Sequence, residues 1–397
     1  MLPEFFEFYN PTRIIFGNNL SLDCGNEIES LGISTLGIVT DKGILGTGLV
    51  DKIKNAIAEK TGIKVPGVYS DVPENSSVKT VEAGAKLFNE WGCDGILAIG
   101  GGSVIDTGKA INILISEGGD LCEDYMGAQT LTKPLKPLVV MPTTAGTGSE
   151  VTMVAVIYKE DENLKVPFTD KFLLPALAVI DPVLTLTLPP KFTAGTGMDA
   201  LTHAMEAIVG IQSSPMSDAL AFEAIKLIKN NLLIAIKDGN NLEARGNMLI
   251  ASTLAGIAFS HSMVGCVHGM SHTCGGLFHV PHGVANSILL PYGLLYNLEA
   301  AKEKIARIAG VWGIPDSSPI LNKPDTTIMA IGLIEDIKNF QKELNAACGL
   351  PFRLRDVGIK EEDLQSIAEG TVLDGTSFYN PREVTAEDIL TVLKEAY

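Results

Sequence analysis

Apolar positions in the first half of the chain form short runs that end at glycine, aspartate or proline. These runs are residues 13–17, 36–41, 95–100, 138–142 and 177–181. Segments of helix length that mix polar and apolar residues lie between several of them, at 76–91 and 103–117. Apolar strands that alternate with amphipathic helices are typical of a parallel sheet covered on both faces. The pattern predicts an α/β fold for this half.

The pattern changes after residues 189–190, where two prolines stand together and strand signals nearly vanish. Ser214 and Pro215 form an N-cap and first-turn pair, and apolar residues then recur every fourth position until the helix stops at 238–239. We therefore predict two domains, an α/β domain at 1–189 and an all-α domain at 190–397. Residues 311–326, rich in proline, predict a loop inside the second domain.

Composition excludes several classes of protein. The chain has 397 residues, enough for a sizeable core in each domain, and its net charge is −17 with no cluster of Lys and Arg. Nucleic acid is therefore not an expected partner. The six cysteines are scattered without a CxxC pair, and the N-terminus lacks the basic and apolar regions of a signal peptide. These features predict a cytoplasmic protein without a disulfide framework.

Residues 246–298 contain no Asp, Glu, Lys or Arg, yet they hold five of the six histidines. A membrane hairpin is the first alternative for such a stretch, but Gly, Ser, Asn and His interrupt its apolar runs every few residues. We therefore expect no membrane partner. An uncharged segment that concentrates histidines predicts buried helices lining a site.

Three features of the first half are typical of a dinucleotide site. Glycines at 100–102 follow a strand and precede a helix, where backbone can approach a pyrophosphate. A run rich in Thr, Ser and Gly follows the next strand, at 141–150. Asp41, at a strand end, can bind a ribose and would repel a 2′-phosphate, which favours NAD over NADP. A tight turn without ligand explains the glycines equally well, as turn capping explains Asp41.

The second half carries residues with metal-ligand spacing. Asp199 and His203 stand four residues apart on one helical face, as do His268 and His272, and His282 follows a proline. A single histidine is more often a satisfied core residue than a ligand, but this joint placement favours a metal site. A carboxylate with imidazoles suits Fe²⁺ or Zn²⁺ and leaves positions open for a substrate oxygen. His261 and His279 have no partner at such spacing, so we assign them structural roles.

With these motifs assembled, the sequence resembles the iron-containing (group III) alcohol dehydrogenases from end to end. The matching segments are VTDK at 39–42, GGGS at 100–103, PTTAGT at 142–147, TGMDALTH at 196–203, HGMSH at 268–272, PHG at 281–283 and NPR at 380–382. The resemblance implies a dinucleotide-binding first domain, a metal-binding second domain and a homodimer.

The resemblance also implies roles for individual residues. The metal ligands would be Asp199, His203, His268 and His282. His272 falls where the family has a further active-site histidine near the nicotinamide. The cofactor contacts would be Asp41, Gly101, Gly102, Ser103, Thr143, Thr144, Thr147, Thr152, Val156 and Lys165. Two positions depart from the family: its Pro-Asn-Pro reads Pro-Glu-Asn-Ser at 73–76, and Val154 stands where some diol-specific relatives have a polar residue.

The expected reaction is hydride transfer between a primary alcohol, or its aldehyde, and NAD(P), with Fe²⁺ or Zn²⁺ as Lewis acid on the alcohol oxygen. His272 would relay the proton. The alternatives are a lyase similar to 3-dehydroquinate synthase, a glycerol-dehydrogenase-like enzyme and a non-catalytic metal- or nucleotide-binding protein. The lyase needs several Lys and Arg for its anionic substrate, and residues 246–298 supply none. A complete ligand set beside a complete cofactor set disfavours a non-catalytic role.

Overall fold

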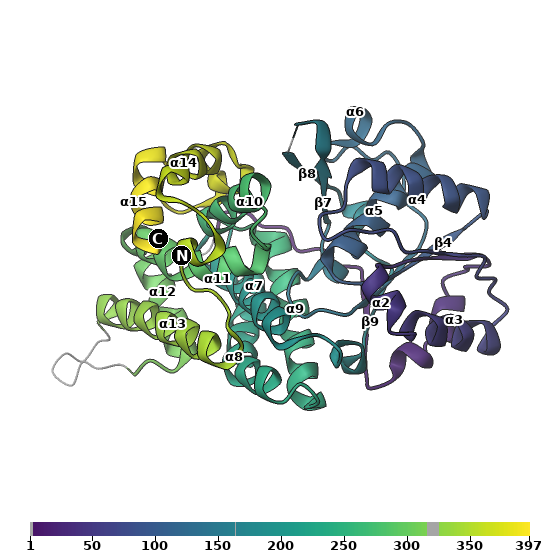
Figure 1. The fold of residues 1–397 in the computed structure, drawn as a ribbon, viewed down its shortest axis with the longest axis horizontal. Coiled ribbons are helices and arrows are strands. Elements are labelled where there is room, and N and C mark those ends of the chain that lie inside the picture. The colour runs from purple at the N-terminus through teal and green to yellow at the C-terminus, as the bar shows by residue number, and fades with distance from the viewer. Residues whose placement is uncertain (1–2, 163, 316–324) are drawn as a thin grey trace. The chain divides into compact units, whose positions relative to one another are not determined.

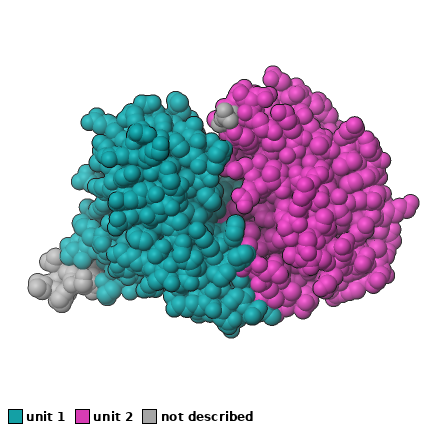
Figure 2. Space-filling view, viewed as in Figure 1, with its two compact units in different colours: residues 1–8, 189–397 teal, residues 9–188 magenta. Residues whose placement is uncertain are grey.

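The computed structural model describes residues 3–162, 164–315 and 325–397. The chain forms two compact units, which Figure 2 colours separately. The sheet unit is Tyr9–Leu188, and the helical unit is Pro189–Tyr397 together with the segment before Tyr9. The apolar pattern predicts a single domain for residues 1–189. The N-terminal segment belongs instead to the helical unit, where the Phe8 ring stacks on His261 with centroids 4.3 Å apart.

The described residues of the sheet unit form a six-stranded parallel sheet with the strand order β1-β9-β6-β4-β2-β3. Its strands are β1 (Arg13–Phe16), β2 (Leu36–Val39), β3 (Val68–Tyr69), β4 (Gly95–Gly100), β6 (Leu138–Pro142) and β9 (Leu177–Ile180). The five predicted strands are present. The register pairs Gly100 with Pro142, so β4 and β6 end side by side and their following loops start together.

Helices cover both faces of this sheet, as predicted (Figure 1). One face carries α4 (Val78–Glu90) and α5 (Gly102–Glu117), and the other carries α1 (Gly25–Glu29) and α3 (Leu49–Lys60). Successive residues of a strand point to opposite faces, so in β4 Ile96 and Ala98 pack in the first core and Leu97 and Ile99 in the second. The shorter helices of the unit are α2 (Lys42–Gly46), α6 (Leu121–Tyr125), η1 (Leu20–Leu22), η2 (Ser149–Val151), η3 (Glu160–Glu162), η4 (Lys171–Leu173) and η5 (Pro182–Thr185).

A second, three-stranded sheet was not predicted. It contains β5 (Gly127–Ala128), β8 (Leu164–Thr169) and β7 (Val154–Lys159), and β7 and β8 form an antiparallel pair. Both long strands are only half-buried; β7 contains an apolar run at 154–158, whereas β8 is interrupted by Lys165 and Pro167. This sheet packs its buried residues, such as Ile157 and Phe168, into the core beside α4 and α5.

The described residues of the helical unit form helices and no strand. The helices are α7 (Pro190–Val209), α8 (Pro215–Lys237), α9 (Leu242–Ser262), α10 (Cys266–Phe278), α11 (His282–Tyr296), α12 (Leu298–Trp312), α13 (Thr326–Cys348), α14 (Leu364–Leu373), α15 (Ala386–Ala396), η6 (Leu354–Val357), η7 (Glu361–Asp363) and η8 (Gly375–Tyr379). Ser214 caps α8 as predicted. Because α12 runs to Trp312, the loop predicted at 311–326 begins later than expected, and its residues 316–324 lie outside the described residues.

Helix α7 is the centre of this unit and is buried over most of its length. The uncharged residues 246–298 form most of α9, α10 and α11, whose residues are also mostly buried. Among the described residues, no single helix is long and apolar enough to cross a membrane, and α9 with α10 passes that test only as a pair bent by 104°. The six cysteines, all of them described, form no disulfide.

Candidate active site

Three helices of the unit bring four candidate metal ligands together. Helix α7 contributes Asp199 and His203, one turn apart on the same face, while α10 contributes His268 and α11 begins at His282. Each side chain offers one donor atom, and these atoms all lie within 4.8 Å of one another. The Oδ1 atom of Asp199 is 3.4 Å from Nε2 of His282 and 3.8 Å from Nε2 of His268. A carboxylate with three imidazoles fits a divalent metal of the Fe²⁺ or Zn²⁺ type.

The surroundings keep the central imidazole neutral. Burial, reinforced by the nearby rings of His203 and His272, lowers the pKa of His268 well below its usual value. A neutral imidazole retains the lone pair that a metal requires. The rings of His203 and His268 stack with centroids 4.5 Å apart, and Phe259 of α9 stacks on the other side of His203 at 4.2 Å.

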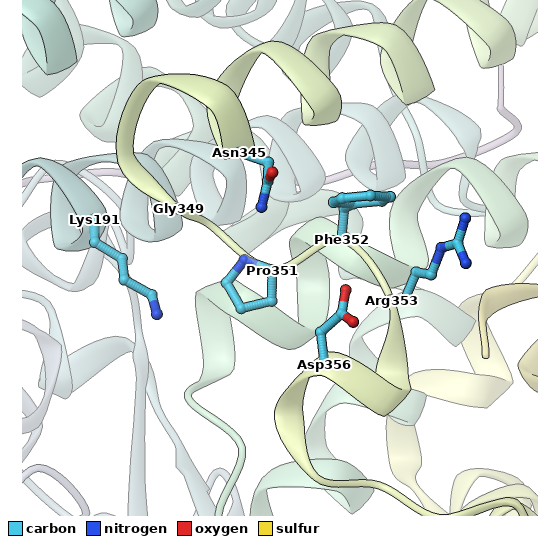
Figure 3. A pocket seen from close by; sticks show the side chains of 7 residues that line it. All are labelled: Lys191, Asn345, Gly349, Pro351, Phe352, Arg353 and Asp356. Carbon is cyan, nitrogen blue, oxygen red and sulfur yellow. The ribbon is translucent and has the colours of Figure 1, made fainter.

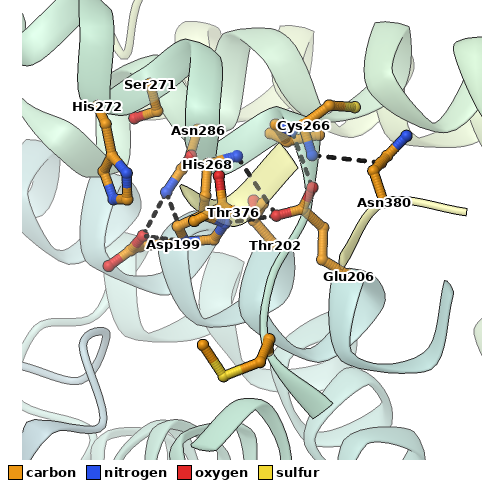
Figure 4. Close-up of polar contacts among 12 residues, drawn as sticks. Asp199, Thr202, Glu206, Cys266, His268, Ser271, His272, Asn286, Thr376 and Asn380 are labelled. Atoms are coloured by element: carbon orange, nitrogen blue, oxygen red, sulfur yellow. Dashed lines mark hydrogen bonds and ion pairs between the residues drawn. The ribbon is translucent and has the colours of Figure 1, made fainter. Parts of the chain in front are cut away.

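Buried polar side chains contact the ligands from behind (Figure 4). Glu206, on α7, places Oε2 2.5 Å from Nδ1 of His268, and its Oε1 accepts the Val267 N–H at 2.8 Å. Burial raises the pKa of Glu206 to about 7, although the N–H groups at the start of α10 oppose this shift. Glu206 therefore connects α7 to α10 directly behind one candidate ligand.

The atoms of the cluster that could bind a metal face one another. The Ser271 hydroxyl donates to the His282 carbonyl at 3.1 Å, so its oxygen is left to accept the Nδ1–H of His282, also at 3.1 Å. The Asn286 amide Nδ2 donates to Asp199 Oδ1 at 2.7 Å and lies 3.1 and 3.2 Å from Nε2 of His268 and His282. Oδ1 of Asp199 and Nε2 of His268 and His282 thus converge on one N–H₂ group, which places these three atoms close enough together to share a cation.

His272 lies beside the four-ligand group but outside it. Its ring stacks on that of His282 with centroids 5.3 Å apart, and its Nδ1 is 3.0 Å from Oδ2 of Asp374. The other oxygen of Asp374 accepts the amide and hydroxyl of Thr376. Burial alone would raise the pKa of Asp374, but His272 and Thr376 outweigh it and lower the pKa. The His272 side chain is 27% exposed, so it contacts both the cluster and solvent.

In the sheet unit, the strand order brings two of the predicted cofactor residues to one edge of the sheet. Strand β3 lies on one side of β2, whereas β4, β6 and β9 follow on the other side. The order therefore reverses between β2 and β4, and ligands of open α/β sheets bind outside the carboxyl ends of strands at such a point. Asp41 follows β2 and Gly101 follows β4, so both predicted residues stand at this reversal.

The glycine loop (100–102) and the threonine loop (141–150) pack against each other at this edge. Gly101 is the N-cap of α5. A Cβ atom on Gly102 would lie 2.7 Å from Cγ2 of Thr147, and one on Gly101 would lie 3.2 Å from Oγ1 of Thr144. The Thr143 N–H also donates to the Gly100 carbonyl at 3.0 Å. Glycine is therefore required here by close approach of two loops.

Two charged residues of α5, the buried Lys109 and the half-buried Asp106, hold the end of the threonine loop. Lys109 donates to the carbonyls of Thr152 and Val154, both at 2.8 Å, and to the Thr152 hydroxyl at 3.0 Å. Asp106 accepts the Val156 N–H at 3.0 Å and the Ser149 hydroxyl at 2.6 Å. Burial lowers the pKa of Lys109 to about 8, against the pull of Asp106. These contacts fix the predicted residues Thr152 and Val156.

The remaining predicted cofactor residues have the following places. Asp41 caps α2 by accepting the Ile44 N–H with Oδ1 at 2.9 Å, which is the capping role that the sequence left open. The cap does not use the other carboxylate oxygen of Asp41. The hydroxyl of Ser103 donates to the Glu74 carbonyl. Lys165 lies in β8 opposite Tyr158 of β7.

A separate cavity of 480 Å³ lies in the helical unit (Figure 3). It is lined by Lys191, Asn345, Gly349, Pro351, Phe352, Arg353 and Asp356. None of these is a predicted site residue, and Lys191, Arg353 and Asp356 are exposed. This cavity is therefore not part of the candidate active site, which is located by the convergence of Asp199, His203, His268 and His282.

Comparison with known proteins agrees with this geometry. The family described as iron-containing alcohol dehydrogenase matches residues 11–182, and its C-terminal counterpart, the Fe-containing alcohol dehydrogenase family, matches residues 193–397. The chain belongs to the iron-containing alcohol dehydrogenase family. Among its relatives is a 1,3-propanediol dehydrogenase of Citrobacter freundii, 41% identical over 99% of both chains. An NAD-dependent methanol dehydrogenase of Bacillus methanolicus is 35% identical over 98% of this chain and 99% of the relative.

The solved structures give the same result for the fold. The alcohol dehydrogenase from Oenococcus oeni superposes with a TM-score of 0.93 at 36% identity, covering 99% of this chain and 100% of the other. Membership of the iron-containing alcohol dehydrogenases confirms the family that the motifs indicated. It also confirms the predicted fold class, a parallel α/β domain followed by a helical one.

Sequence reasoning missed the residues that support the predicted ligands. Glu206, Asn286 and Asp374 contact Asp199, His268 or His272, and Asp106 and Lys109 hold the threonine loop. Glu206 extends the Asp199 and His203 spacing by a further turn of α7, and Asn286 stands four residues after His282, so a helical-face argument could have found both. Asp374 follows His272 by 102 residues and could not be found by spacing.

Proposed function

We propose that this member of the iron-containing alcohol dehydrogenase family oxidises a small primary alcohol, or reduces its aldehyde, with NAD and one divalent metal. The observation that carries the proposal is the convergence of the donor atoms of Asp199, His203, His268 and His282. When bound there, Fe²⁺ or Zn²⁺ supplies Lewis acidity toward the substrate oxygen. The reaction is balanced as alcohol plus NAD⁺ giving aldehyde, NADH and one proton.

The chain's own residues would handle that proton. His272 is beside the cluster and partly exposed, and Asp374 at 3.0 Å accepts its Nδ1–H. This leaves Nε2 as the atom that accepts a proton from the alcohol side, and imidazole is the side chain that exchanges protons near neutral pH. We infer that His272 passes the proton outward and that Asp374 fixes its tautomer.

We further infer that the sheet unit binds the dinucleotide at the reversal between β2 and β4. The N-terminus of α5 at Gly101 and Gly102 offers backbone N–H groups to a pyrophosphate. Asp41 would accept the ribose hydroxyls with its remaining oxygen. Lys42, the nearest cation in sequence, is paired with Asp71 at 2.8 Å, so it is already engaged by a carboxylate. This local acidity supports NAD over NADP.

The substrate class rests on the relatives and on one side chain. Relatives that match nearly the whole chain are named for a three-carbon diol and for methanol, which points to small primary alcohols. Val154 is apolar at the start of β7, which weakens the case for a diol without deciding between a diol and a monoalcohol. The lyase alternative is disfavoured, since both family matches are to alcohol dehydrogenases.

We also propose a homodimer. Strand β1 is an edge of the main sheet, and its Ile14 and Phe16 side chains are 40% and 52% exposed. An exposed apolar edge strand is a template for pairing with another chain. The cytoplasmic location stays a prediction from the sequence.

The test is a spectrophotometric assay of NADH at 340 nm with purified protein, NAD⁺ and either 1-butanol or 1,3-propanediol. Protein stripped with a chelator and then reloaded with Fe²⁺ or Zn²⁺ should regain activity, and the stripped protein should have none. Binding of metal without NADH production from any small alcohol would overturn the proposed activity.

A further inference from the structure

Glu206 is the buried acid of α7 that the proposed reaction does not use. Its side chain is 4% exposed, and it accepts from the backbone N–H groups of Val267 and His268 at 2.8 and 3.3 Å. Its Oε2 atom is also 2.5 Å from Nδ1 of His268. A buried carboxylate is unfavourable unless several donors satisfy it, and here the donors belong to the first turn of α10.

The contact determines which nitrogen of His268 can bind a cation. In neutral imidazole, one nitrogen carries the proton and the other carries the lone pair. If Nδ1–H donates to Glu206, the lone pair is on Nε2, the atom that faces Asp199 at 3.8 Å. If Nε2 carried the proton instead, His268 would present a donor to the cluster and could not be a ligand.

Glu206 also fixes the position of the ring. The acid links α7, which carries Asp199 and His203, to the start of α10, where it accepts the N–H of the residue before His268 and that of His268 itself. The three ligands on these two helices are therefore connected through one side chain. Carboxylates that hold a ligating histidine in this way raise metal affinity in other proteins, and their loss typically weakens metal binding by roughly 10- to 100-fold.

We propose that Glu206 is a positioning residue of the metal centre, which sets its metal affinity by holding His268 with the proton on Nδ1 and the lone pair on Nε2. This inference rests on the proposed function, because it takes the four converging residues as metal ligands. It goes beyond that function by assigning a role to a residue that contacts neither substrate nor metal.

The experiment titrates chelator-stripped protein with Co²⁺, which reports its ligands by visible absorption. Glu206→Gln keeps the size of the side chain but replaces one acceptor oxygen with an N–H₂ donor facing the N–H groups of α10. We expect Co²⁺ binding to weaken by roughly 10- to 100-fold and the absorption bands to shift. The control is Asp218→Asn, which removes a partly buried carboxylate of the same unit that pairs with Arg307 at 2.9 Å. It should lower thermal stability while leaving Co²⁺ affinity and spectrum unchanged.

A second measurement on the wild-type protein needs no variant to fold. Selective ¹⁵N-histidine labelling should show His268 protonated on Nδ1 both in the stripped protein and with Zn²⁺ bound. An Nε2–H tautomer in the stripped protein, or wild-type affinity and spectrum in Glu206→Gln, would overturn the inference and leave the proposed function intact. Failure of the wild-type protein to bind Co²⁺ through His268 would overturn the metal assignment and this inference with it.

Discussion

The proposed metal cluster of the helical unit and the proposed cofactor site of the sheet unit, at the strand ends beside Asp41, Gly101 and Gly102 (the strand-end site), are built in opposite ways. The cluster consists of side chains on long helices, and buried neighbours such as Glu206, Ser271 and Asn286 hold those side chains by hydrogen bonds. The strand-end site consists largely of backbone, because Gly101 and Gly102 let two loops approach within contact distance. The first site depends on particular side chains, and the second depends on glycines that have no Cβ atom.

This difference predicts opposite sensitivities. In the helical unit, deletion of a side chain should do the most damage, since each ligand contributes a donor that nothing else replaces. In the sheet unit, addition of a methyl group should do the most damage, since the loops have no space for it. The first kind of change should alter metal content, and the second should alter cofactor affinity while metal content stays constant.

The largest effect is expected for His268→Ala. It removes a buried imidazole from the centre of the cluster, so bound metal and turnover should both fall to background. Metal analysis of the purified variant checks this. The matched control is His279→Asn, which removes an exposed histidine outside the cluster and keeps a residue that tolerates its φ of 56°. Normal metal content in His268→Ala would make the assignment wrong.

The next effect separates the two histidines of α10. In His272→Ala the four-ligand group remains, so metal content should stay near that of the wild type. The kcat should fall by roughly tenfold to a thousandfold, because a group that moves a proton is lost. Stoichiometric loss of metal would make His272 a ligand, and an unchanged kcat would make it a packing residue.

In the sheet unit, Gly102→Ala should impair cofactor binding and leave metal content unchanged. Its Cβ atom would lie 2.7 Å from Cγ2 of Thr147, and overpacking of this kind lowers folding stability by about 1–3 kcal/mol. Where the two loops separate to relieve the contact, binding of NAD⁺ loses up to the same free energy, so its KM should rise by up to roughly 150-fold. Adding Thr147→Ser removes the clashing methyl group and should restore part of the loss. A double variant no better than the single one would argue against the loop contact as the cause.

A smaller effect is expected for cofactor choice. Asp41→Asn keeps an oxygen to cap α2 but removes the charge, so the preference for NAD⁺ over NADP⁺ in kcat/KM should narrow by roughly tenfold or more. Glu59→Gln, which removes an exposed carboxylate on α3 of the same unit, serves as the control and should leave the preference unchanged. A wild-type preference for NADP⁺ would contradict the ribose role of Asp41.

The same contrast explains what the sequence could predict. Helical spacing paired Asp199 with His203 and His268 with His272, because residues four apart lie on one face of a helix. It could not show that His282, on the next helix, lies closer to the group than His272 does. The apolar runs gave the five main strands and both covered faces. Sequence periodicity could not supply the partner of His272, since Asp374 reaches it only through packing of α14 and η8 against α10. Strand β7 is an apolar run that the prediction passed over, and β8 is interrupted by Lys165 and Pro167, so the pairing of the two strands had no clear signal in the sequence.

The smallest effect is expected from the backbone strain at Met263, the residue that ends α9. Met263 ends α9 with φ 62° and ψ −179°, a backbone conformation that is essentially restricted to glycine and costs roughly 1–3 kcal/mol in other residues. Met263→Gly relieves this strain but gives the unfolded chain more freedom, worth about 0.5–1 kcal/mol. We therefore expect a net gain of about 1 kcal/mol in the free energy of unfolding, measured by urea denaturation of the metal-free protein.

Co²⁺ affinity tests whether the strain at Met263 helps to position His268. Met263 precedes α10 by three residues, and that helix carries His268. If the strained link holds His268 in place, Met263→Gly should be more stable than the wild type yet bind Co²⁺ a few-fold more weakly. Gly265→Ala tests steric crowding at the same link, because its Cβ atom would lie 2.9 Å from Oδ1 of Asn380. Equal Co²⁺ affinity in Met263→Gly and wild type would show that the helices alone position the ligand, and that the strain belongs to the turn.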